Sequence, residues 1–179
     1  MYIHKDSKFN VALVSLCYLI SLIFSTTPAI AGTISFSGNI LGGTCTITNP
    51  TINIPLGDHK VTDFSGKGSV LGWYNFNINL NCEANAKVSV KIDATQDPSN
   101  EQSVMALDSG DDTADGVGVE LWFTNGTGTY VNFGDVQYYN TFTKEGPATI
   151  QLAARYHQTK DIMTPGVANA TAQFTIIYD

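Results

Sequence analysis

The residues best suited to chemistry are four aspartates in one short stretch. They are Asp108, Asp111, Asp112 and Asp115, followed at once by Gly116. Carboxylates on a flexible loop suit Ca²⁺, which prefers oxygen ligands. With Asp111 as the first ligand, however, the twelfth position holds Trp122 instead of a glutamate that binds through both oxygens. The spacing therefore favours a solvated turn over a calcium site.

The first 31 residues are typical of a secretory signal. Lys5 and Lys8 precede an apolar run at 11–24, and residues 29–31 read Ala-Ile-Ala, a small-x-small cleavage site. The run is shorter than the roughly 20 residues that a membrane-spanning helix needs. We therefore exclude residues 1–31 from the fold and expect no membrane span in the mature chain.

Cleavage after Ala31 leaves 148 of the 179 residues, which fits one domain. The loss of Lys5, Asp6 and Lys8 takes the formal charge from −7 to −8, and the remaining basic residues are scattered. Because nucleic-acid binding needs a basic face, we expect no nucleic-acid partner.

The histidines and cysteines of the mature region give little support for an enzyme. His59 and His157 lie too far apart in sequence to indicate a metal cluster or a triad. Cys45 and Cys82 predict a disulfide in an exported protein, and two thiols that bind metal are the alternative. We find no phosphate-binding loop and no nucleophile elbow, so we expect a binding or structural module without a cofactor.

Apolar residues alternate with polar ones in several short segments, as in half-buried β-strands. The clearest are residues 74–82, 88–94, 117–123 and 150–156. The short connection Glu-Ala-Asn-Ala at residues 83–86 predicts that the first two are antiparallel neighbours. Residues 98–115, rich in Ser, Asn, Gly and Asp, are expected to form one exposed loop. No segment has a helical period, so the fold class is all-β, and a two-sheet sandwich fits the strand spacing.

Both ends of the mature chain also alternate. One face of the last segment carries Gly166, Ala168, Ala170, Ala172, Phe174, Ile176 and Tyr178, and one face of the first carries Ile34, Phe36, Gly38 and Ile40. Gly38 inside such a pattern indicates a bend or a close backbone approach, or else a simple turn. A strand with an open edge needs a partner, so the chain either closes on itself or pairs with another molecule. An ordinary core strand in a complete sandwich is the alternative interpretation of the last segment.

Four features together resemble the pilin subunits of chaperone-usher fimbriae, the type 1 and P pilus superfamily of Gram-negative bacteria. The mature start, Gly-Thr-Ile-Ser-Phe-Ser-Gly-Asn-Ile-Leu-Gly-Gly-Thr-Cys at residues 32–45, resembles the family's opening, and Cys82 follows at a typical distance. Residues 115–121, Asp-Gly-Val-Gly-Val-Glu-Leu, resemble a central strand of the family. Gly166 and the penultimate Tyr178 match its C-terminal signature.

The resemblance implies an incomplete immunoglobulin-like sandwich that lacks its final strand and is completed by donor-strand complementation. Residues 32–43 would form an N-terminal donor-strand extension and residues 44–179 the pilin domain. Ile34, Phe36, Gly38 and Ile40 would enter a neighbour's groove, and the alternating residues from Gly166 to Tyr178 would border this chain's own groove and bind the chaperone. The implied partners are a periplasmic pilus chaperone, an outer-membrane usher and neighbouring pilin subunits in a head-to-tail polymer. The chain would be exported through the periplasm to the cell-surface fimbrium.

The function expected from this resemblance is that of a structural fimbrial subunit and not an enzyme. Only thirteen residues precede Cys45 in the predicted mature chain, which favours a minor or adaptor subunit over the rod subunit. A receptor-binding minor subunit of the same fimbria is the alternative, with Trp73, Trp122 and Tyr130 as candidate sugar-stacking aromatics. A two-domain adhesin would need a further domain, and a copper-zinc dismutase would need a histidine cluster.

Overall fold

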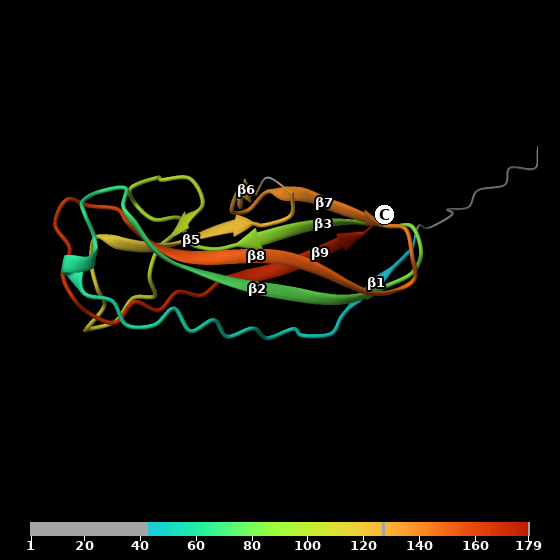
Figure 1. Cartoon of the computed structure of the whole chain (residues 1–179), viewed down its shortest axis with the longest axis horizontal. Helices are drawn as coiled ribbons and strands as arrows, with labels where there is room; N and C mark the ends of the chain where they lie inside the picture. Colours follow the sequence, from blue (N-terminus) through green and yellow to red (C-terminus); the bar gives the residue numbers. More distant parts are fainter. Residues whose placement is uncertain (1–42, 127, 179) are drawn as a thin grey trace, which may run out of the picture. The chain divides into compact units, whose positions relative to one another are not determined.

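The computed structural model describes residues 43–126 and 128–178 (Figure 1). The regular secondary structure of these residues is β-strand, apart from one short 3₁₀ turn at Val61–Asp63. The strands are β1 (Cys45–Ile47), β2 (Val70–Cys82), β3 (Ala86–Asp93), β4 (Val104–Met105), β5 (Val117–Phe123), β6 (Thr129–Tyr130), β7 (Val136–Phe142), β8 (Gly146–Gln158) and β9 (Gln173–Tyr178). No helix in this part of the chain is long and apolar enough to cross a bilayer.

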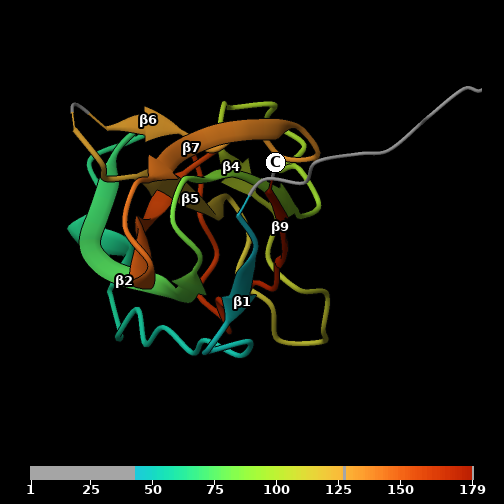
Figure 2. The ribbon, with the colours of Figure 1, turned by 90° about the vertical axis from the view of Figure 1, so that its right-hand side faces the viewer.

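The strands form two antiparallel sheets that pack face to face. The larger sheet has the order β1-β2-β8-β5-β4, with β6 also paired to β5, and the smaller has the order β7-β3-β9. Figure 2 looks along the strands and places β2 and β9 on opposite sides. The inward side chains of both sheets, such as Ile78, Ile150, Val88 and Val90, are fully buried. Each large apolar side chain buried in this way contributes roughly 1.5–3 kcal/mol, so the alternation that the sequence shows is what holds the two sheets together.

The expected pairing of residues 74–82 with residues 88–94 is wrong. β2 pairs with β1 and β8, whereas β3 pairs with β7 and β9, so the chain crosses from one sheet to the other. Asn85 makes the tight crossing with a φ of 65°, a left-handed conformation that asparagine tolerates. Because the chain crosses over, the apolar faces of β2 and β3 pack against each other across the sandwich. Pairing of the two strands side by side in one sheet would not allow this contact.

The expectation of one exposed loop at residues 98–115 is also wrong in part. β4 lies within it, and Ser103, Val104 and Met105 are buried. The Ser103 hydroxyl donates to the carbonyl of Leu121 and accepts a hydrogen bond from the Val131 amide. Two apolar residues are too few to show a period, so sequence patterning does not detect this strand.

The disulfide prediction is confirmed. Cys45 on β1 lies directly opposite Cys82 on β2, with the sulfur atoms 2.08 Å apart. The bond joins residues 37 positions apart, so it fixes the short strand β1 to the edge of the larger sheet.

Replacing both Cys45 and Cys82 by serine is expected to lower the free energy of unfolding by about 4 kcal/mol, because a cross-link over a loop of this length restricts the unfolded chain. Guanidinium unfolding followed by tryptophan fluorescence measures the difference. Dithiothreitol provides the control, since it should destabilise the native protein and leave the double variant unchanged. Equal stability of the two proteins under oxidising conditions would contradict the prediction.

Candidate strand-docking groove

A groove of about 1240 Å³ opens between two segments from opposite ends of the described chain. One border is residues 50–58, which follow β1 and run along the lower side of the molecule in Figure 1. The other border is residues 168–174, which lead into β9. A buried water needs only about 10–15 Å³, and native interiors contain few voids larger than that. The groove is therefore far larger than a packing defect.

The floor of the groove is the hydrophobic core itself. Ile78 and Ala154 come from the larger sheet and Ile92 from the smaller one, and all three are buried residues that line the groove. The groove thus lies where the two sheets separate along one side of the sandwich. An apolar strand placed there would extend the core from both sheets at once.

The C-terminal border alternates as the sequence predicts. Ala168, Ala170, Ala172 and Phe174 are partly buried and line the groove, while the residues between them are exposed. The regular strand is shorter than expected, because it begins at Gln173. β9 pairs with β3 along one edge, and no other strand of the described chain pairs with its second edge. The second edge therefore offers a free hydrogen-bonding ladder beside an apolar row.

The N-terminal border was missed by sequence reasoning. Ile52, Ile54 and Leu56 are half-buried and alternate with exposed residues, so the same period of two is present on this side. Residues 50–58 make no backbone-to-backbone hydrogen bond with any other described residue. This border is thus a second segment that pairs with no described strand, and the one backbone contact it makes with a described side chain is that of the Leu56 carbonyl with His59 Nε2, at 3.0 Å.

Tyr156 on β8 contacts the C-terminal border and the residue that follows the N-terminal border. Its hydroxyl donates to the carbonyl of Ala168 at 3.0 Å, and its ring meets the His59 imidazole edge to face at 5.7 Å. Burial raises the pKa of the Tyr156 phenol, which keeps it protonated as a donor. His59 Nε2 lies 3.2 Å from the Tyr74 hydroxyl, so this exposed histidine makes a polar contact beside the groove.

The remaining predicted groove residues lie beyond the lining. Ile176 is partly buried opposite Val90, and Tyr178 pairs with Val88 at the end of β9 with much of its ring exposed. The predicted donor residues Ile34, Phe36, Gly38 and Ile40, and the predicted signal segment, lie outside the described residues. The aspartates of the acidic stretch are spread out: Asp108 accepts a hydrogen bond from Thr171 and Asp115 pairs with Lys160.

Gly166 fixes where the C-terminal border begins. The Val167 amide donates to the carbonyl of Asp112 and the Ala114 amide donates to the carbonyl of Val167. A Cβ atom added to Gly166 would lie 2.3 Å from the Asp112 oxygen and 2.5 Å from the Ala114 nitrogen, both backbone atoms. Only glycine permits this close approach.

Gly166→Ala is expected to lower the free energy of unfolding by about 1–3 kcal/mol, because the backbone of residues 112–114 must move to admit the methyl group. Thermal unfolding measures the loss. Gly110→Ala is the matched control, since a Cβ there meets only the Thr113 hydroxyl, at 3.3 Å. Equal melting temperatures for the two variants would show that the close approach is not required.

Known proteins with the same pattern are fimbrial subunits. Residues 34–179 match the family described as fimbrial protein. The type-1 fimbrial protein subunit of Serratia marcescens is 34% identical over 173 residues, which cover 89% of this chain and 96% of that protein. The crystal structure of a type I fimbria protein from Burkholderia pseudomallei is 30% identical, with a TM-score of 0.55 over 78% of this chain and 99% of that one.

A further solved structure agrees in fold. The P pilus rod subunit superposes with a TM-score of 0.57 over 75% of this chain and 99% of that one, at 18% identity. Subunits of this class polymerise with neighbouring subunits into surface fimbriae of Gram-negative bacteria. The chain belongs to the fimbrial protein family: it is a structural subunit of a fimbria of the chaperone-usher type, built on an immunoglobulin-like sandwich, and it is not an enzyme.

Proposed function

We propose that the groove receives a β-strand from another molecule, and that in the fibre this strand is the N-terminal extension of the next subunit. The proposal is supported chiefly by one observation: two borders, each with a half-buried apolar row and an edge that pairs with no other described strand, flank an opening into the core. A strand laid between them would pair with both borders and fill the missing layer.

The donor residues in this proposal are Ile34, Phe36, Gly38 and Ile40, within an extension at residues 32–43 that precedes a pilin domain at residues 44–179. Burying the three large side chains contributes roughly 5–9 kcal/mol before the entropy cost of association. Gly38 allows the donor backbone to approach the groove closely. Because the donor segment and the groove are different surfaces of one chain, the contacts are head-to-tail and generate an open filament.

A periplasmic chaperone occupies the groove before assembly, and the outer-membrane usher is where the next subunit replaces it. An unfilled apolar groove would otherwise expose the core and promote aggregation during export. The chaperone is proposed to pair with the free edge of the segment that carries Gly166, Ala168, Ala170, Ala172, Phe174, Ile176 and Tyr178.

Co-expression of the chain with the chaperone encoded nearest its gene tests this step. We expect the two proteins to copurify in a 1:1 complex, and we expect the subunit to be lost to degradation when the chaperone is omitted. A subunit that accumulates equally well alone would refute the proposed chaperone step.

We propose further that the subunit occupies a minor or adaptor position. The short stretch between the predicted cleavage site and Cys45 supports this position. Deleting the gene is expected to leave fibres that are fewer or altered at their ends, visible by electron microscopy. Complete loss of the fibre shaft, restored by the gene in trans, would instead identify the rod subunit.

Receptor binding by the same subunit is the second candidate function. It is favoured by one observation: Trp73, Trp122 and Tyr130 come together on one face of the larger sheet.

A further inference from the structure

Four side chains from four different strands form one cluster on the outer face of the larger sheet. We call the cluster the aromatic face; it consists of Trp73 on β2, Trp122 on β5, Tyr130 on β6 and Arg155 on β8. The Trp122 ring lies 4.0 Å from Tyr130 and 6.3 Å from Trp73, measured between centroids. The Arg155 guanidinium carbon lies 5.3 Å and 5.4 Å from the two indole centroids. Cation–π contacts with Arg155 therefore join the two indole rings, and Tyr130 packs against Trp122.

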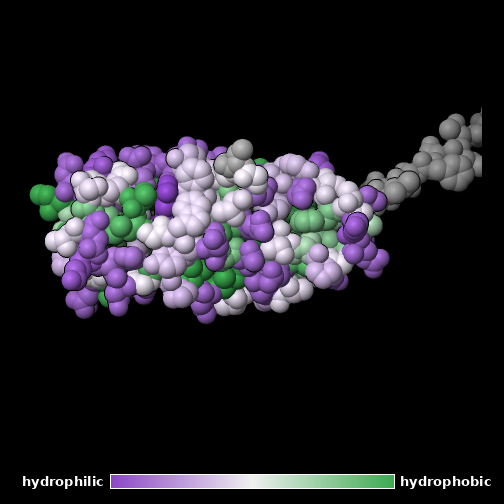
Figure 3. Space-filling view, viewed as in Figure 1, coloured by the Kyte–Doolittle hydropathy of each residue, from purple (hydrophilic) through white to green (hydrophobic). Residues whose placement is uncertain are grey.

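The aromatic face points away from the core. Leu121 and Phe123, on either side of Trp122, are buried inward, so Trp122 points outward. Trp73 is 47% exposed and Tyr130 is 37% exposed. In Figure 3, which views this side of the molecule, pale residues of intermediate hydropathy gather near β6, as expected for exposed Trp and Tyr. Exposed aromatic side chains that adjoin one another in this way are typical of an interaction surface.

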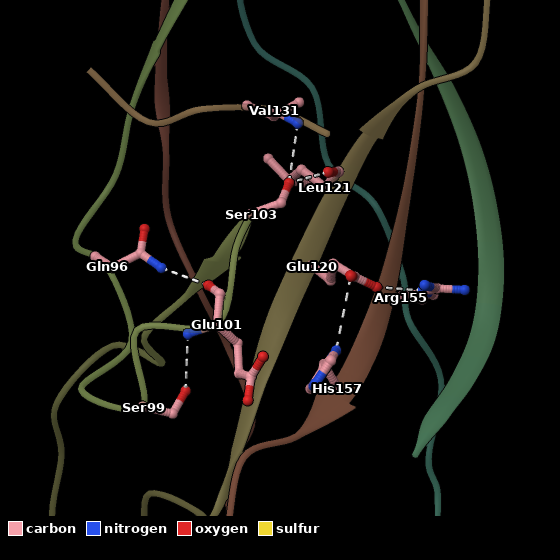
Figure 4. Close-up of polar contacts among 9 residues, drawn as sticks. All are labelled: Gln96, Ser99, Glu101, Ser103, Glu120, Leu121, Val131, Arg155 and His157. Atoms are coloured by element: carbon pink, nitrogen blue, oxygen red, sulfur yellow. Dashed lines mark hydrogen bonds and ion pairs between the residues drawn. The ribbon is translucent and has the colours of Figure 1, made fainter. Parts of the chain in front are cut away.

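A buried carboxylate holds Arg155 in place. Glu120 is only 2% exposed and accepts a hydrogen bond from Arg155 Nε, and His157 Nδ1 lies 3.7 Å from its second oxygen (Figure 4). The terminal Nη atoms of Arg155 make no hydrogen bond with any other described residue. The guanidinium is thus fixed on one edge and retains free donors on the other, so little entropy is lost when a ligand pairs with it.

Amide side chains border the aromatic face along β2. The Trp73 indole N–H donates to Asn75 Oδ1 at 3.1 Å, which fixes the orientation of this ring. Asn77 is exposed beyond it and lies opposite Gln151 of β8. Each amide offers donors as well as an acceptor. The surface thus combines apolar ring faces with uncharged hydrogen-bonding groups, which is the combination that matches a sugar: an apolar C–H face and a rim of hydroxyl groups.

Charge decides which class of sugar fits. The chain is acidic overall, with a formal charge of −7, yet Arg155 is the ionic group that the aromatic face turns outward, because its partner Glu120 is buried. A carboxylate is the anion that a free guanidinium edge binds best. A second copy of the chain fits less well, since a stable protein interface needs roughly 20–30 residues a side and the aromatic face has four.

We propose that the aromatic face binds an acidic saccharide, with the sugar ring stacked on Trp73 and Tyr130 and its carboxylate paired with Arg155. The proposal rests on the second candidate function, receptor binding, and it does not depend on the groove, which opens between other segments.

The test measures binding of purified fibres that contain the subunit to immobilised 3′-sialyllactose, to lactose, and to a panel of other acidic and neutral oligosaccharides. Trp73→Ala and Tyr130→Ala are compared with Tyr138→Ala, a matched control whose ring is 58% exposed on β7 of the other sheet. We expect binding to one or more acidic members, at least tenfold weaker binding by the first two variants, and unchanged binding by the control. Raising the salt concentration should weaken the interaction.

Three results would overturn the proposal: no saccharide on the panel is retained, only neutral saccharides are retained, or all three variants bind equally. Incorporation of each variant into fibres is measured in parallel. If Trp73→Ala fibres lose lateral association while no saccharide binds, the aromatic face is a contact between copies. Normal incorporation of Trp73→Ala into fibres together with lost saccharide binding supports the proposal. Because incorporation tests the groove and saccharide retention tests the aromatic face, failure of one proposal does not imply failure of the other.

Discussion

Phe36→Arg is expected to abolish incorporation of the subunit into fibres, with at least a hundredfold loss of polymer, while the complex with the chaperone still forms. Phe36 is the largest side chain that the proposed donor strand places in a neighbour's groove. Its removal forfeits roughly 1.5–3 kcal/mol, and an unpaired guanidinium in an apolar site adds a desolvation penalty of several kcal/mol. Chaperone binding should be spared, because in the proposed assembly the donor strand takes no part in it. Polymer is measured by electron microscopy and by sedimentation of surface fibres.

Ser37→Arg is the matched control, since residue 37 would lie on the opposite face of the proposed donor strand. It adds the same charge but points it away from the groove, so fibres should form normally. Polymerisation of Phe36→Arg at the level of the control would mean that residues 34–40 are not the donor strand.

Deleting residues 174–179 is expected to abolish chaperone binding and to leave the subunit degraded or aggregated. The deletion removes nearly all of β9, which pairs with β3 from Val88 to Asp93, and it uncovers the buried side chains of Val90 and Ile92. Phe174 and Ile176 are partly buried, so their loss alone costs at most roughly 3–6 kcal/mol, set against a whole stability of about 5–15 kcal/mol for an ordinary domain.

Copurification with the chaperone and the half-life of the subunit in cells measure this effect. Thr175→Ala provides the control, because Thr175 is an exposed residue in the same strand. A truncated chain that persists as a soluble monomer would refute a structural role for β9 beside an open groove.

Period-two alternation predicts much of this fold from sequence alone, because each strand has one buried and one exposed face. Residues 117–123 form β5 with the expected bounds, and residues 150–156 lie within the longer β8. The assignment of strands to sheets is harder to predict from sequence, since β2 and β3 are joined by a few residues yet belong to different sheets. Alternation reveals that a strand has an apolar face but not which sheet covers it.

The groove is predicted by sequence on one side only. The C-terminal border has a long alternating run, whereas the border at residues 50–58 has just three apolar residues, interrupted by Pro55. The aromatic face is also only partly predictable from sequence. The sequence identifies the aromatic residues, but their clustering on one surface depends on the pairing of β2, β8, β5 and β6. The burial of Glu120 is not predictable, because the alternation of β5 would place it in solvent.

The most direct test of the open groove is a self-completed variant in which residues 32–44 are repeated after Asp179 through a short flexible linker. We expect this chain to fold without a chaperone into a monomer that no longer polymerises, and to exceed the unmodified subunit in its free energy of unfolding by about 5–9 kcal/mol. The same variant with Phe36→Arg in the appended copy should lose the gain. If the unmodified chain already folds alone into an equally stable monomer, and the appended strand changes nothing, then the groove does not need a strand from another molecule.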